Sequence, residues 1–142
     1  MTEHMIERYF NLAKTASAFS DYKGVHIGAV CVYKHKIISV GYNMSKSSPL
    51  QMKYNKYRNR DGREFDTNAH VNALHAELSC IQSIRSLDVD FSKVSIFVYR
   101  EHKDGSNAVS KPCRACSKAL DDLGIKEWYY TTDNGYAYER RN

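Results

Sequence analysis

The sequence lacks any apolar run long enough to span a membrane, since no stretch approaches the roughly 20 apolar residues that a transmembrane helix needs. Its first residues alternate polar and apolar side chains and contain no apolar core of a secretory signal. No internal repeat or low-complexity tract is visible either. We therefore expect a protein without membrane contact, folded as one domain over residues 1–142, a length that can bury a core.

The sequence has only four cysteines, and two of them are spaced like metal ligands, although four could also form two disulfides. Cys113 and Cys116 form a Cys-x-x-Cys unit, and His75 lies upstream of it. Two disulfides would need an oxidising compartment, whereas metal-binding thiolates fit a reducing one. We therefore expect a cytoplasmic protein.

Acidic residues are outnumbered, with 16 Asp and Glu against 21 Lys and Arg, which gives a net charge of +5 and a pI near 9.0. A basic balance suits a polyanionic partner or a phosphorylated small substrate. A surplus of this size is also common on ordinary soluble proteins. Charge alone leaves both interpretations open.

The spacing of apolar residues predicts a helix, a hairpin, a helix, a strand, a helix and a strand, in that order. This order is typical of an α/β protein with three layers, α/β/α, around a mixed central sheet. Pro112 is expected at the start of the third helix and Gly124 at its C-cap. The expected bounds are 5–16, 25–33 with 37–42, 75–87, 94–99, 112–124 and 125–132.

The long segment 43–71 is polar, basic and aromatic, and we expect it to be a functional loop or lid. Within it, residues 53–60 alternate basic and aromatic side chains, a composition that can stack on single-stranded nucleic acid. The alternative, which we favour slightly, is a solvated loop whose tyrosines pack against the domain. An intermediate hypothesis is that Lys46, Lys53 or Arg58 binds a substrate phosphate.

Two short motifs carry the strongest functional signal, His75-Ala76-Glu77 and Pro112-Cys113-Arg114-Ala115-Cys116. They supply one imidazole, two thiolates and one carboxylate that need not bind metal. A zinc ion with three protein ligands keeps its fourth position open to water, which distinguishes a catalytic site from a structural one. Water bound in this way has a pKa of about 7, so a hydroxide nucleophile is available at neutral pH.

The pattern His-x-Glu followed by Pro-Cys-x-x-Cys is that of the zinc deaminases. The chain resembles the cytidine deaminase superfamily, and within it the CMP/dCMP-type deaminase domains, from about residue 24 to 132. Three weaker matches lie in the right order around the motifs: Gly28-Ala29-Val30, Gly41-Tyr42-Asn43 and Gly124-Ile125-Lys126. The resemblance implies the cytidine deaminase-like fold, Zn²⁺ as cofactor and a homo-oligomer.

The resemblance also implies roles for individual residues. Glu77 would take a proton from the zinc-bound water, protonate the ring nitrogen and help the amine to leave. Asn43 would contact the substrate sugar hydroxyl, although an asparagine at a strand exit is also a common turn-former. The Ala76 N–H would bind the ring carbonyl, and the Ser110 carbonyl would accept from the substrate amino group.

A structural zinc site is the alternative, with Cys31, Cys80 or His70 as fourth ligand to His75 and the Cys-x-x-Cys pair. The carboxylate two residues after the histidine and the proline before the first cysteine favour catalysis. Cys31 and Cys80 lie in apolar surroundings and are expected to be small buried side chains. His70 is expected to be a hydrogen-bonded structural histidine.

Three functions are compatible with these observations. The first choice is hydrolytic deamination of a cytosine nucleotide, dCMP to dUMP, at a zinc bound by His75, Cys113 and Cys116. The second is deamination of cytosine or adenine in tRNA or single-stranded DNA. The third, from a different class, is a non-catalytic zinc-stabilised binding module.

Overall fold

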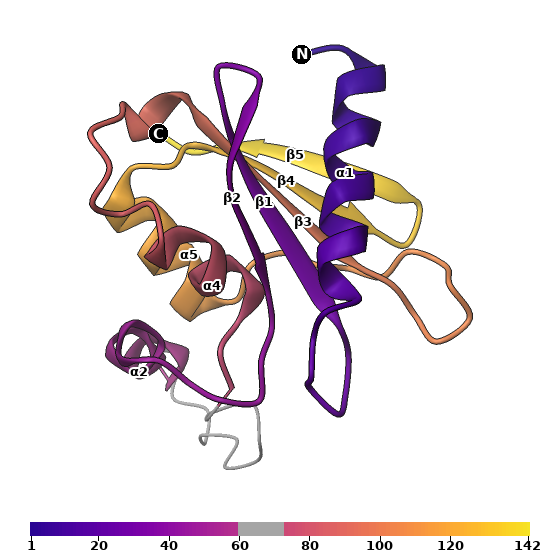
Figure 1. The fold of residues 1–142 in the computed structure, drawn as a ribbon, viewed down its shortest axis with the longest axis horizontal. Helices are drawn as coiled ribbons and strands as arrows, with labels where there is room; N and C mark the ends of the chain where they lie inside the picture. The colour runs from indigo at the N-terminus through magenta and orange to yellow at the C-terminus, as the bar shows by residue number, and fades with distance from the viewer. Residues whose placement is uncertain (60–72) are drawn as a thin grey trace.

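The protein is described by a computed structural model that covers residues 1–59 and 73–142. Five strands form one sheet in the order β2-β1-β3-β4-β5 (Figure 1). β3 and β4 are parallel, whereas the other neighbouring pairs are antiparallel, so the sheet is mixed as predicted. The strands are β1 (Ile27–Tyr33), β2 (Lys36–Tyr42), β3 (Val94–Arg100), β4 (Glu127–Thr132) and β5 (Gly135–Arg140).

Helices cover both faces of this sheet, which confirms the three layers. Successive residues of a strand point to opposite faces. Val30 and Val32 pack with α1, whereas Ala29 and Cys31 of the same strand pack in the cluster that holds α4 and α5. Figure 1 accordingly draws α1 on one side of the strands and α4 and α5 on the other. The helices are α1 (Glu3–Ser17), α2 (Pro49–Asn55), α4 (Ala76–Gln82) and α5 (Arg114–Leu123), with short 3-10 turns η1 (Lys56–Asn59) and η2 (Phe91–Lys93).

Aromatic rings fill the layer between α1 and the sheet. Phe97 of β3 lies at their centre, stacked on Tyr129 at 4.4 Å between ring centroids. Tyr9 and Phe10 of α1 approach the same ring at 5.2 and 5.3 Å. Such pairs contribute packing and orientation beyond their apolar area, so this layer holds α1 firmly on β1 and β3.

A glycine sets the position of α4, the helix that follows the first motif. A Cβ atom on Gly41 of β2 would lie 2.5 Å from the backbone nitrogen of Cys80 and 2.6 Å from the carbonyl oxygen of Ala76. No larger residue fits there without moving the helix, because real Cβ atoms do not approach backbone this closely. Gly41 thus lets α4 lie directly on β2.

The segment predicted as a lid is not structureless in its first half. Residues 49–55 form α2 and residues 56–59 form η1, while residues 60–71 of the predicted lid lie outside the described residues. Ser48 caps α2, because its side chain accepts a hydrogen bond from the N–H of Gln51, and Pro49 occupies the first turn. A serine followed by proline is a helix-start signal that the polar composition concealed.

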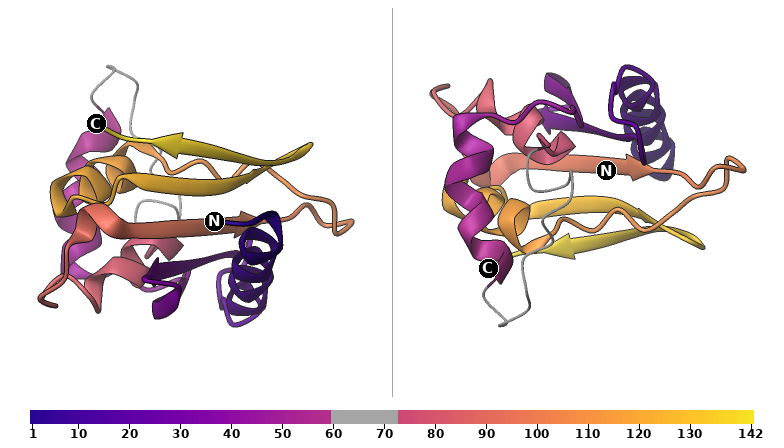
Figure 2. Two further views of the ribbon diagram at one scale, coloured as in Figure 1. Left: turned by 90° about the horizontal axis from the view of Figure 1, so that it is seen from above. Right: turned by 90° about the horizontal axis from the view of Figure 1, so that it is seen from below.

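Three further expectations were wrong in detail. The helix after His75 ends at Gln82, not at residue 87. Pro112 precedes the N-cap residue Cys113 and is outside α5. The chain also continues past the last predicted strand into β5, which Figure 2 shows beside β4 as a hairpin. In the described parts of the chain, no helix combines the length and apolar character needed to cross a membrane.

Candidate active site

The three side chains predicted to bind zinc lie together. His75 Nδ1 is 3.5 Å from Cys113 Sγ and 3.4 Å from Cys116 Sγ, and the three ligand atoms all lie within 4.8 Å of one another. A tetrahedral zinc with bonds of about 2.1 Å to nitrogen and about 2.3 Å to sulfur would separate these atoms by about 3.6 Å. The residues therefore fit a zinc ion in both donor type and spacing.

Two helix N-termini bring these ligands together. His75 is the N-cap of α4 and Cys113 is the N-cap of α5, both in extended backbone conformation. Cys116 lies in the first turn of α5 and is fully buried. A hydrogen bond from the Cys116 side chain holds the pKa of the Cys113 thiol well below its ordinary value against the opposing effect of burial, and His75 adds to the lowering. Thiolate formation is thus favoured where a metal needs it.

Gln51 of α2 positions the histidine and is a site residue that sequence reasoning missed. Its side chain is fully buried, and Oε1 accepts a hydrogen bond of 2.9 Å from the backbone N–H of His75. Its Nε2 donates to Asn55 Oδ1 at 2.8 Å. A buried amide with both ends bonded fixes the chain that leads into α4. A glutamine eight residues past the start of an apparent loop has no sequence signature of this role.

Glu77 lies at the same helix start and lines the same pocket as His75 and Cys113. It is buried, with 5% of its surface exposed. Burial raises the pKa of Glu77 from 4.5 to about 7, although the neighbouring His75 acts to lower it. An acid whose pKa lies near neutral pH is suited to both accept and donate protons.

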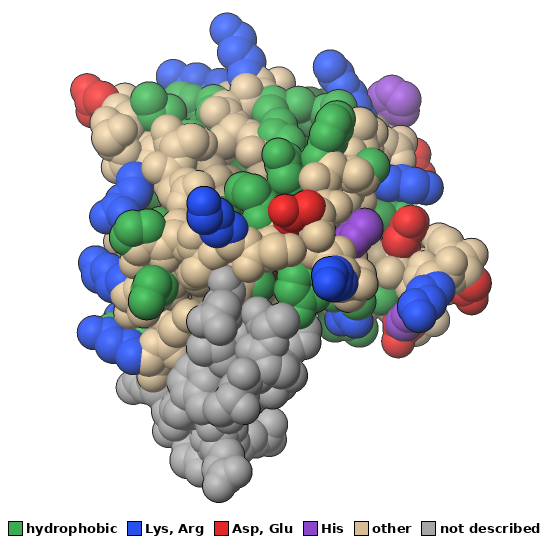
Figure 3. Space-filling model, turned by 60° about the horizontal axis from the view of Figure 1, so that its bottom comes forward, with side chains coloured by type: hydrophobic (Ala, Val, Ile, Leu, Met, Phe, Trp, Pro, Cys, Tyr) green, Lys and Arg blue, Asp and Glu red, His purple; other side chains and the backbone are tan. Residues whose placement is uncertain are grey.

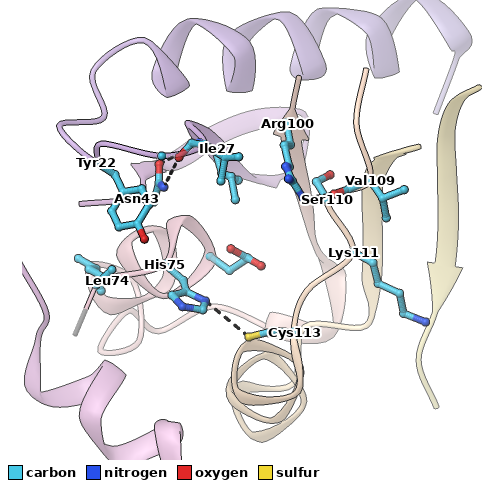
Figure 4. Close-up of a pocket in the computed structure, with 14 residues that line it drawn as sticks. Tyr22, Ile27, Asn43, Leu74, His75, Arg100, Val109, Ser110, Lys111 and Cys113 are labelled. Atoms are coloured by element: carbon cyan, nitrogen blue, oxygen red, sulfur yellow. Dashed lines mark hydrogen bonds between the residues drawn. The ribbon is translucent and has the colours of Figure 1, made fainter. Parts of the chain in front are cut away.

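The pocket has a volume of about 580 Å³, within the range of small-molecule sites. Figure 4 shows its walls: His75 and Cys113 on one side, Asn43 and Ile27 across from them, and Ser110 beside Arg100. The two motifs, the end of β2 and the segment before Pro112 thus meet around one cavity.

The predicted substrate-binding residues differ in how much of their hydrogen-bonding capacity the fold already uses. Asn43 lines the pocket, but its Oδ1 accepts from the Ile27 N–H at 2.9 Å and its Nδ2 donates to the Val25 carbonyl at 2.8 Å. The turn-forming role of Asn43 is therefore present, and one N–H and one lone pair remain by stoichiometry for a ligand.

Ser110 lines the pocket, but its hydroxyl is used inside the fold. Ser110 Oγ donates to the Val98 carbonyl at 2.7 Å and lies 2.8 Å from Thr131 Oγ1. The expected contact through the Ser110 backbone carbonyl stays a prediction. Ala76 is fully buried as the first residue of α4, and its predicted N–H contact also stays untested.

Cys31 and Cys80 are buried as expected and do not belong to the metal-binding group of the described residues. Both have 0% exposure. Their sulfur atoms lie 3.4 Å apart, and Cys80 Sγ is 3.0 Å from Ser39 Oγ. Burial raises the pKa of the Cys80 thiol well above its ordinary value, so it is inert packing material in this setting. His70 lies outside the described residues.

The basic and aromatic run at 53–60 packs against the domain where it is described. Tyr54 is buried at 6% exposure, and its hydroxyl donates to Asp122 Oδ2 at 2.8 Å. Lys118 Nζ lies 5.6 Å from the centre of the Tyr57 ring. Among the described residues that line the pocket, neither Lys46 nor Lys53 appears. The Arg58 side chain and residue 60 lie outside the description.

The chain matches the family of the cytidine and deoxycytidylate deaminase zinc-binding region over residues 3–132. The protein belongs to this family. The resemblance stated from the two motifs is thereby confirmed, and the chain is an enzyme of the zinc-dependent cytosine deaminase type. A non-catalytic binding module is not supported.

Solved structures share the fold at low identity. A dCMP deaminase from the cyanophage S-TIM5 in apo form is 22% identical, with a TM-score of 0.64 over 92% of this chain and 84% of that chain. The structure of the same enzyme in complex with dCMP and dUMP is 21% identical, with a TM-score of 0.62 over 92% of this chain and 82% of that chain. A cytidine deaminase from Burkholderia pseudomallei is 19% identical, with a TM-score of 0.63 over 99% of this chain and 93% of that chain. These likenesses show the fold alone. No curated protein matches the chain.

Proposed function

We propose that the protein converts dCMP to dUMP with release of ammonia. The observation that carries this proposal is the pocket of about 580 Å³ in which Glu77 lies beside the group of His75, Cys113 and Cys116. A cavity of this size suits one nucleotide. The cyanophage neighbour in complex with dCMP and dUMP supports this choice of substrate.

In this proposal His75, Cys113 and Cys116 are the zinc ligands. Zinc held by them would supply a Lewis acid that lowers the pKa of a water molecule to about 7. Glu77 would accept a proton from the attacking water and pass it to the ring nitrogen next to the reacting carbon. It then carries the second proton to the exocyclic amine. One C–O bond forms, one C–N bond breaks, and water and substrate give dUMP and ammonia.

Backbone and amide groups of the pocket orient the base and the sugar. The Ala76 N–H binds the ring carbonyl, and the Ser110 carbonyl accepts from the amine that will leave. Asn43, already fixed by Val25 and Ile27, contacts a sugar hydroxyl with its remaining hydrogen-bonding capacity. Because these groups are held by the fold before substrate binds, little reorganisation is needed in the reaction.

Deamination of tRNA or single-stranded DNA is the second candidate, and the net charge of +5 favours it. Two observations speak for the mononucleotide. Tyr54 of the basic and aromatic run is buried and cannot stack on a base. Lys and Arg side chains on the face in Figure 3 are scattered among apolar and polar ones in the part that described residues form. A nucleic-acid track would need several cations in a row.

Ammonia release from a substrate panel tests the proposal. Zinc-loaded protein is incubated with dCMP, deoxycytidine, CMP, a short single-stranded DNA and tRNA. We expect dCMP turnover that depends only modestly on salt, because one phosphate is bound. Deamination of DNA or tRNA without activity on any mononucleotide would favour the second candidate instead. Homo-oligomer formation and a cytoplasmic location stay predictions.

A further inference from the structure

Two basic side chains line the pocket among the described residues, Arg100 and Lys111. Their surroundings differ. Lys111 Nζ pairs with Glu139 Oε1 at 3.8 Å, and its side chain is 55% exposed. In Figure 4 it points away from His75 and Cys113, whereas the Arg100 guanidinium points into the space between these residues and Ser110. Lys111 is therefore engaged elsewhere, and Arg100 is the cation that faces the cavity.

The Arg100 guanidinium is only partly bonded. One terminal nitrogen, Nη1, donates to the Val109 carbonyl at 3.3 Å, a long contact for a hydrogen bond. Its Nε is buried and has no hydrogen-bond partner among the described residues. A buried N–H group without a partner is costly. Such a cation beside a cavity is poised for an anion that would satisfy it.

Arg100 also lies next to the residue proposed to bind the sugar. It is the last residue of β3 and pairs with Ile27 of β1. The Ile27 N–H in turn donates to Asn43 Oδ1, from the end of β2. Asn43 and Arg100 therefore flank the same residue from opposite sides, two strand spacings or about 10 Å apart. A long arginine side chain can cover part of that distance.

We propose that Arg100 binds the 5′-phosphate of the substrate and so makes the enzyme select a nucleotide over a nucleoside. This inference rests on the proposed deamination of a cytosine nucleotide. Because Nε is shielded, the guanidinium leaves the Val109 carbonyl on binding and turns Nε and a terminal nitrogen toward the phosphate. The planar fork of arginine matches two phosphate oxygens at once.

The test compares kcat/KM for dCMP and for deoxycytidine in zinc-loaded wild type and in Arg100→Gln. We expect the variant to lose about 10- to 100-fold on dCMP, as for loss of a charged hydrogen bond, and to keep its activity on deoxycytidine. Activity on the nucleoside shows that the variant folds. Lys111→Met is the matched control. It removes a cation from the same pocket wall, and we expect kcat/KM to stay near wild type for both dCMP and deoxycytidine.

Arg100→Lys keeps the charge but not the fork and should lie between wild type and Arg100→Gln on dCMP. It replaces Arg100→Gln if that variant does not fold. The inference is overturned if wild type has the same kcat/KM for dCMP and deoxycytidine. It is also overturned if the arginine variants lower kcat/KM equally for both substrates, or for neither. Wild-type activity on an oligonucleotide alone would refute the proposed function, and the inference with it. The wild-type substrate profile thus tests the function, and the variant ratio tests Arg100.

Discussion

The two faces of the sheet are built from different materials. The face under α1 is aromatic, with Phe97 and Tyr129 stacked at 4.4 Å, and neither ring lines the pocket that holds Glu77. The opposite face is covered by α4 and α5, whose N-cap residues are His75 and Cys113. All of the metal-binding side chains therefore lie in one layer. The aromatic layer under α1 therefore serves stability, whereas the N-termini of α4 and α5 in the opposite layer carry the reactive groups.

Glu77→Gln should produce the largest effect on the chemical side of this comparison. The amide cannot take a proton from water, so turnover should fall by about 10²- to 10⁴-fold. None of the proposed ligands is changed, so zinc content and unfolding temperature of the loaded protein should stay near wild type. Ammonia release and zinc content measured on the same samples check this. Activity that tracks a loss of zinc would point to a ligand role for Glu77.

The stability of the metal-free protein should depend on pH through the same residue. Since the pKa of Glu77 is raised from 4.5 to about 7, the folded state holds a proton that the unfolded state has lost. The stabilisation is complete below pH 4.5, decreases as pH rises through about 7, and amounts to about 3 kcal/mol.

Urea unfolding of metal-free wild type and Glu77→Gln from pH 4 to 8 measures the contribution of Glu77 to the free energy of unfolding. All other titrating groups are common to both proteins, so their effects cancel when one free energy is subtracted from the other. Wild type should lose stability relative to the variant as pH rises. A difference that is flat across this range would show that Glu77 is not held protonated by burial.

Two glycines allow a matched test of the two layers. A Cβ atom on Gly28 would overlap the carbonyl oxygen of Ala13 in α1, and one on Gly41 would press on Cys80 and Ala76 of α4. Alanine at either position should destabilise the fold by about 1–3 kcal/mol through overpacking. Only Gly41→Ala should also lower zinc affinity and kcat/KM, because it displaces the helix that begins at His75.

Denaturant unfolding gives the stability of both glycine variants, and assays at a temperature where both are folded give the activity. An equal loss of kcat/KM in Gly28→Ala and Gly41→Ala would contradict the assignment of separate roles to the two layers.

The sequence predicted most of the fold because the long apolar segments follow clear periods. The segment at 27–33 and the helix that begins after Cys113 are close to their predicted places. The zinc motifs were equally readable, because coordination chemistry restricts both residue type and spacing. What escaped were elements with a weak apolar pattern. α2 has only seven residues, too few to show a clear helical period, and β5 follows a turn at 133–134 with mostly half-exposed side chains.

The missed site residues act through three-dimensional neighbours. Gln51 matters because its amide meets the backbone of His75. Arg100 matters because the end of β3 lies beside Ile27 and Asn43. No physical constraint fixes how far either residue lies from the zinc motifs in the sequence. The two motifs were predictable because each has its chemistry within one helical turn.

X-ray absorption at the zinc edge of the loaded protein tests directly whether His75, Cys113 and Cys116 bind the metal. We expect one zinc per chain with two sulfur ligands at about 2.3 Å and two lighter ligands, His75 and water, at about 2.0–2.1 Å. Cys113→Ser and Cys116→Ser should each remove one of the two sulfurs. Three or more sulfur ligands in the native protein, a sulfur count unchanged in either variant, or no bound zinc would contradict it.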